Sequence, residues 1–123
     1  MEVEVQESQS AIEDGLHQGT IEKIEYRNIM DSKDPNKVLY TYADIFIKEE
    51  KTEVQLKYGT PVRITEKTKL GKLLQNFTEL MIGHKIDPEK VLLGKKVKFM
   101  TITERTPDGE FARIVDGSIK PIN

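Results

Sequence analysis

The chain has 123 residues, of which 33% are charged, and a formal net charge of −2. That length supplies one ordinary hydrophobic core and is too short for two comfortable ones. The sequence contains no cysteine, which excludes disulfides, thiol catalysis and zinc or iron held by sulfur.

No basic leader followed by an apolar run opens the sequence, and no apolar run approaches the length that spans a membrane. We therefore expect a soluble, cytoplasmic protein that has no membrane partner.

The charge is divided unevenly along the chain. Residues 1–14 carry no base, and their five acids are Glu2, Glu4, Glu7, Glu13 and Asp14. The rest of the chain then holds 19 basic side chains against 16 acidic ones, a net charge of +3. We read 1–14 as an acidic flexible tail and 15–123 as one domain, and we hypothesise that the tail recruits a protein partner or competes with an anionic ligand.

The first predicted strand covers residues 16–29. Ile21 and Ile24 are three residues apart, which breaks strict alternation, and Gly19 precedes them. A bulge in a long, bent strand explains this spacing. Turn-forming residues at 31–37 then predict a long hairpin loop.

The second predicted strand, 38–49, alternates most clearly. Alternation places successive side chains on opposite faces. One row is apolar enough for a core: Leu39, Thr41, Ala43, Ile45 and Ile47. The other row is unusual for a solvent face because three of its five members are aromatic: Tyr40, Tyr42, Asp44, Phe46 and Lys48. Either a second layer covers Tyr40, Tyr42 and Phe46, which we call the aromatic row, or the row is a platform for planar ligands.

A third strand is predicted at 53–58, with Lys57 on its polar face. Helical spacing follows: the apolar stripe consists of Leu70, Leu73, Leu74, Phe77, Leu80 and Met81. Thr68 is the expected N-cap and Gly83 the expected stop. Asp87 and Pro88 predict the start of a short second helix that ends at Gly94. Two more strands, 95–105 and 110–115, flank a tight turn at 106–109.

This order of elements, three strands, a helix and two strands, favours an all-β fold. A five-stranded, partly open Greek-key barrel with the helix between its third and fourth strands satisfies the order and hides most strand edges.

Several segments resemble a known family. They are 19–24, at the start of a bent first strand; Thr68-Lys69-Leu70-Gly71-Lys72-Leu73-Leu74; Leu92-Leu93-Gly94-Lys95-Lys96-Val97; and 110–114. Over roughly 15–121 the chain is similar to oligonucleotide/oligosaccharide-binding (OB) domains, in particular to small phage and archaeal single-OB proteins grouped with single-strand DNA-binding proteins of replication. The resemblance implies a ligand face on strands two and three between two flanking loops.

Mapped onto this chain, the resemblance implies stacking on Tyr40, Tyr42 and Phe46 and phosphate contacts from Lys48 and Lys57. At the flanking loops it implies Lys33, Lys37 and Arg105. Aromatic stacking tolerates any base, because every base has a planar face. Each lysine also has an ordinary interpretation as part of a solvated surface.

Arg113 lies in the fifth predicted strand and has two interpretations. It binds a phosphate or stacks on a base, or it pairs with Glu104 or Asp116. Asp44, within the aromatic row, either accepts a hydrogen bond from a base or holds a nearby lysine.

No catalytic or metal-binding pattern is present. His17 and His84 lack partners at ligand spacing, and no phosphate-binding glycine loop or nucleophile elbow occurs. We therefore expect a non-enzymatic protein without cofactor or metal that binds single-stranded DNA, with RNA as the second choice, largely without sequence preference. The alternative is an assembly module, an oligomer in which the aromatic row is the subunit interface.

Overall fold

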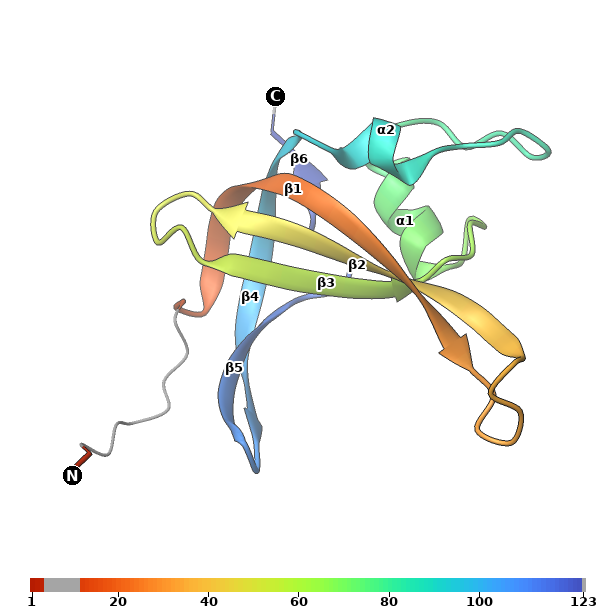
Figure 1. Ribbon diagram of the computed structural model, residues 1–123. Helices are drawn as coiled ribbons and strands as arrows, with labels where there is room; N and C mark the ends of the chain where they lie inside the picture. Colours follow the sequence, from red (N-terminus) through yellow and green to blue (C-terminus); the bar gives the residue numbers. More distant parts are fainter. Residues whose placement is uncertain (4–11, 123) are drawn as a thin grey trace.

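The computed structural model describes residues 1–3 and 12–122 (Figure 1). One antiparallel sheet has the strand order β3-β2-β1-β4-β5, and β6 pairs with β4 at its side. The strands are β1 (Gly15–Met30), β2 (Val38–Glu49), β3 (Gln55–Pro61), β4 (Lys96–Thr106), β5 (Gly109–Ile114) and β6 (Lys120–Pro121). Two short helices, α1 (Lys69–Gln75) and α2 (Pro88–Leu92), lie between β3 and β4 in the chain.

The predicted all-β class is confirmed, but the sheet is not closed. β3 and β5 are the ends of the ladder, and no backbone pairing joins them in the described residues. The two strands still approach each other. The five-stranded Greek-key barrel therefore stays a prediction.

The bend of β1 positions both halves of the sheet. Its first residues pair with β4 and its later ones with β2, and the β1–β2 register shifts between Ile21 and Lys23. This shift confirms the predicted bulge. At Gly19 a Cβ would overlap the carbonyl oxygen of Lys48, so the crossing needs a residue without a side chain.

The core lies on the inner side of the bent sheet. Ile45 and Ile47 of the predicted apolar row are fully buried there, together with Phe99 of β4. Leu74 of α1 and Leu92 of α2 close this core. Leu39, in the same row, is 53% exposed because the β1–β2 hairpin extends past the end of β3 (Figure 1).

The prediction of one helix through Met81 is wrong. The N-cap is as expected, since Thr68 accepts a hydrogen bond from the Gly71 N–H, but α1 ends at Gln75. The side-chain amide of Asn76 donates to the Ile119 carbonyl at 2.9 Å, a contact with the far end of the chain. Phe77 still packs on the core, whereas Met81 is 57% exposed.

The third strand also differs from its predicted bounds. It begins at Gln55 rather than residue 53, because Glu53 has a left-handed φ of 59° that no strand residue adopts. β6 was not predicted. The N-cap Asp87 and the first-turn Pro88 of α2 are confirmed.

The packed domain begins before residue 15. Ile12 is buried in the core, the Glu13 carbonyl accepts from Thr101, and the Asp14 carboxylate accepts from Thr103. Most of the acidic segment, residues 4–11, lies outside the described residues. Its role in recruiting a protein partner therefore stays a prediction.

None of the helices in 1–3 and 12–122 is long and apolar enough to cross a membrane.

Candidate nucleic-acid interface

The aromatic row lies on the side of β2 that faces away from the core. Strand pairing places a residue of β1 and one of β3 beside Tyr42 and Phe46, whereas Tyr40 has only Ile29 of β1 beside it. Phe46 lies between Lys23 and Lys57, and Tyr42 lies between Arg27 and Pro61. We call this surface the outer face; its members are Lys23, Glu25, Arg27, Tyr40, Tyr42, Asp44, Phe46, Lys48, Lys57 and Gly59.

Tyr42 is held flat against the sheet. A Cβ built on Gly59 would come within 2.6 Å of the Tyr42 Cε1 atom, so the ring occupies the space left by the missing side chain. The Arg27 guanidinium lies 4.6 Å from the ring centroid, and its Nε donates to the Asp44 Oδ2 at 3.1 Å. The guanidinium thus lies over the face of the Tyr42 ring in a cation–π contact on the outer face.

Phe46 also has a cation over its ring, the ammonium of Lys23. The Lys23 ammonium lies 4.7 Å from the centre of the ring and 3.1 Å from the Glu25 carboxylate. Lys23 and Glu25 are each at least half exposed, so water screens this pair. The Phe46 ring is therefore covered by a long, solvated side chain that can move aside.

The three rings differ in exposure. Tyr40 is 47% exposed at the protruding end of β2, whereas Tyr42 and Phe46 are partly buried. None of the three is sealed in the interior. The cover over Tyr42 and Phe46 comes from single side chains of β1.

Asp44 occupies the middle of the outer face and is buried. One carboxylate oxygen accepts from Arg27, as the charge-pair interpretation of Asp44 anticipated, although the cation is an arginine and not a lysine. The other oxygen, Oδ1, is buried and has no hydrogen-bond partner among the described residues. An unpaired buried acceptor is destabilising, so Asp44 depends strongly on Arg27.

No protein-family model matches the chain, and no curated protein matches its sequence. Its function is therefore inferred from the geometry of this face.

The predicted cations divide into two groups. Lys48 and Lys57 are exposed on the outer face, Lys48 two residues beyond Phe46 and Lys57 directly opposite that ring. Lys33 and Lys37 are exposed in the loop at the tip of the β1–β2 hairpin. The structure brings the first two next to the rings and leaves the other two at the tip.

Arg105 and Arg113 lie on the β4–β5 hairpin, apart from the aromatic row. Arg105 pairs with Glu110 at 2.8 Å, and the Arg113 Nε lies 3.9 Å from the Glu104 carboxylate. Of the two partners foreseen for Arg113, the structure therefore selects Glu104. In Figure 1 the tip of this hairpin points down and the tip of the β1–β2 hairpin points to the lower right, so the two tips are apart in this view.

Sequence reasoning missed Lys23 and Arg27, the two cations that lie closest to the rings. Alternation alone places them on one face of the first strand, but the bulge after Ile21 shifts the register by one residue. Without that register neither cation can be matched to its ring. In the described residues no group of three or more histidine or acidic side chains is placed to hold a metal ion.

Proposed function

We propose that this protein binds single-stranded nucleic acid, DNA ahead of RNA, along the outer face, and that its sheet is an OB barrel left open between β3 and β5. The observation that carries the proposal is the ladder of three rings on one exposed strand face, two of them in contact with cations from the neighbouring strand. The strand order and the bent, shared β1 support the barrel.

The spacing of the rings suits an extended strand. Side chains two residues apart on a strand are about 7 Å apart, so Tyr40 and Tyr42 are neighbours and Phe46 lies two steps farther along. Each stacked base contributes roughly 1–3 kcal/mol and needs no particular sequence. Such a row binds several nucleotides with little discrimination among bases.

Arg27 and Lys23 occupy the ring faces in the free protein and act as exchangeable covers. An incoming base replaces the Lys23 ammonium on Phe46, and the released cation is then available to a phosphate. At Tyr42 the base stacks either on the ring or on the outer side of the Arg27 guanidinium, which is itself planar. In the free protein Glu25 pairs with Lys23 and Asp44 pairs with Arg27.

Lys48 and Lys57 supply the phosphate contacts. Both are exposed, and neither has an ion-pair partner within the part of the chain that the structure describes. Lys33, Lys37, Arg105 and Arg113 extend this basic surface at the two hairpins. Because phosphate binding releases condensed counterions, affinity falls steeply with salt.

A labelled oligo(dT) titration followed by fluorescence anisotropy tests the proposal. We expect Phe46→Ala to weaken binding by about 1–3 kcal/mol, roughly 5- to 150-fold, because a stacking platform is lost. The matched control is Phe111→Ala, a ring that is 50% exposed on β5 outside the aromatic row. Equal losses in both variants, or no binding at about 50 mM salt, contradict the proposal.

The alternative function is self-assembly, and one observation favours it. The protruding β1–β2 hairpin exposes apolar side chains, including Met30, Val38 and Leu39 at 40%, 46% and 53%. Exposed apolar surface of this kind is typical of protein interfaces. Sedimentation equilibrium separates the two functions: a stable dimer that Leu39→Lys dissociates, together with no response to oligo(dT), would favour assembly.

A further inference from the structure

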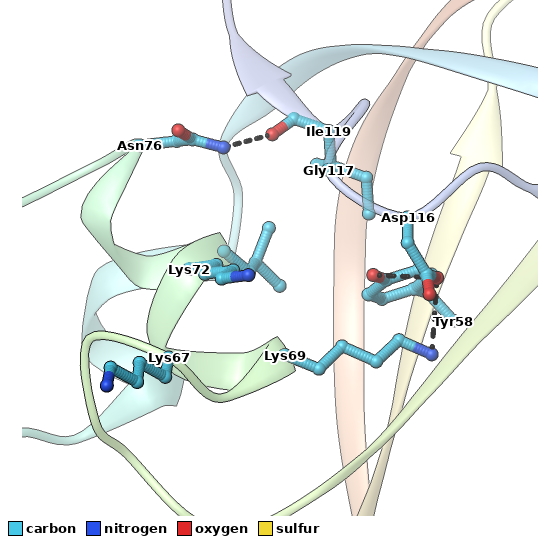
Figure 2. A pocket seen from close by; sticks show the side chains of 9 residues that line it. Tyr58, Lys67, Lys69, Lys72, Asn76, Asp116, Gly117 and Ile119 are labelled. Atoms are coloured by element: carbon cyan, nitrogen blue, oxygen red, sulfur yellow. Dashed lines mark hydrogen bonds and ion pairs between the residues drawn. The ribbon is translucent and has the colours of Figure 1, made fainter.

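A pocket of about 230 Å³ lies at the open seam of the sheet, beneath α1 and away from the outer face (Figure 2). Its lining includes Tyr58 of β3 and Asp116 and Gly117 just after β5. It also includes three lysines, Lys67 in the loop before α1 and Lys69 and Lys72 within α1. Tyr58 points to the inner side of β3, whereas its neighbour Lys57 is exposed on the outer face. The pocket is therefore separate from the proposed strand-binding surface.

One wall of the pocket is a fixed group of polar contacts. The Tyr58 hydroxyl donates to the Asp116 Oδ1 at 3.2 Å. The Lys69 ammonium lies 3.4 Å from the same carboxylate oxygen and 4.3 Å from the centre of the Tyr58 ring. Asp116 and Lys69 thus neutralise each other at the edge of the cavity, and both remain in contact with solvent.

The other two lysines are not neutralised. No carboxylate among the described residues lies within ion-pair distance of Lys67 or Lys72. Asp116 is the one acid in the lining, so three ammonium groups and one carboxylate leave a net charge of +2 around the pocket. Figure 2 shows Lys72 above Lys69, and Lys67 at the rim with its ammonium turned outward.

We propose that this pocket binds a phosphoryl group, either of a free phosphate ester or of a nucleic-acid strand. A phosphoryl dianion matches the excess charge of the lining, and its oxygens accept hydrogen bonds from several lysines at once. Lys72 contacts the ligand directly, Lys69 is shared between the ligand and Asp116, and Lys67 swings in from the rim. The Tyr58 hydroxyl holds Asp116 in place.

The test uses inorganic pyrophosphate as the probe and the full chain labelled with ¹⁵N. We expect a saturable shift of the Gly117 amide signal. Lys72→Gln weakens binding about tenfold, since it removes a hydrogen bond to a charged group. Asp116→Asn tightens binding, because it removes the one repulsive charge and keeps an acceptor for Tyr58. The matched control, Lys51→Gln in the β2–β3 turn, leaves the affinity unchanged.

Three results would overturn the proposal: a Gly117 signal that does not saturate, weaker binding by Asp116→Asn, or an equal loss in Lys51→Gln and Lys72→Gln. Lys72 and Asp116 are both exposed, so neither variant removes core packing.

Oligo(dT) with and without a 5′-phosphate distinguishes a terminal phosphate from the phosphates of the strand backbone as the bound group. A Gly117 shift that requires the 5′-phosphate identifies a terminal phosphate, and a shift with both strands identifies the backbone. Because pyrophosphate binding does not involve the aromatic row, it can succeed or fail independently of strand binding.

Discussion

At the scale of single residues, the contact between Arg27 and Asp44 decides how the outer face is held. Asp44 has only 10% of its side chain exposed, and its second oxygen has no partner among the described residues, whereas the Arg27 side chain is 53% exposed. The two partners are therefore unequal. Arg27 is hydrated without Asp44, but without Arg27 the Asp44 side chain loses the hydrogen bond to its Oδ2 atom.

We predict that Arg27→Ala lowers the free energy of unfolding by about 1–3 kcal/mol, because it leaves a buried carboxylate unpaired. Asp44→Ala costs clearly less, since it removes the unpaired oxygen together with the pair. Urea unfolding of both variants and of the double variant measures this difference. If Arg27→Ala costs the same with Asp44 present or absent, the two residues are not coupled and the interpretation is wrong.

The rings themselves belong to the predictable part of the site. Alternation in β2 placed Tyr40, Tyr42 and Phe46 on the face opposite Ile45 and Ile47, and the structure places them there. Alternation depends only on the chain's own pleat, so a sequence reveals it. The partners on β1 depend on the register across a bulge, which a single strand does not encode.

At the scale of elements, α1 shows where a local rule fails. A glycine inside a helix normally costs about 1 kcal/mol relative to alanine. At Gly71 a Cβ would overlap the carbonyl oxygen of Thr65 and crowd the Thr68 hydroxyl that caps the helix. Here the missing side chain allows the preceding loop to fold back on the first turn of α1.

We expect Gly71→Ala to destabilise the protein by about 1–3 kcal/mol, because overpacking against backbone outweighs the gain in helix propensity. Gln75→Ala, an exposed position of the same helix, is the control and should stay within about 0.5 kcal/mol of the parent. The midpoint of urea unfolding reports both effects. A Gly71→Ala variant more stable than the parent would show that the loop at Thr65 moves away from the added methyl group at little cost.

The same helix explains what periodicity missed. The stripe from Leu70 to Met81 fits one helical face, yet α1 stops when Asn76 bonds to the carbonyl of Ile119. That contact joins residues 43 positions apart in the chain. The N-caps Thr68 and Asp87 and the bulge in β1 were predictable because they are local, whereas this stop and the pairing of β6 depend on long-range contacts.

At the scale of the whole molecule, the open seam between β3 and β5 is the distinctive feature of the fold. Unpaired strand edges invite aggregation unless another segment covers them. Here α1 contacts β3, and the chain after β5 returns to the seam through Asp116 and Ile119. Tyr58 is buried at this junction, so its hydroxyl links the two ends of the sheet.

The protonation of Tyr58 should therefore control stability in alkali. Burial, and then the neighbouring Asp116 carboxylate, raise the pKa of Tyr58 above its usual 10.0. The folded state then holds the proton more tightly than the unfolded state does. The resulting stabilisation is complete below pH 10 and is lost as the pH rises above it.

We predict that the free energy of unfolding of the parent falls more steeply above pH 10 than that of Tyr58→Phe, which has no hydroxyl proton to lose. Urea unfolding at a series of pH values from 8 to about 11 compares the two slopes, and their difference removes the shared contribution of lysine titration. Tyr40→Phe, at an exposed ring, is the control and should keep the parent's steep slope. Parallel curves for the parent and Tyr58→Phe would contradict the prediction, because they would show that folding does not change the affinity of the Tyr58 hydroxyl for its proton.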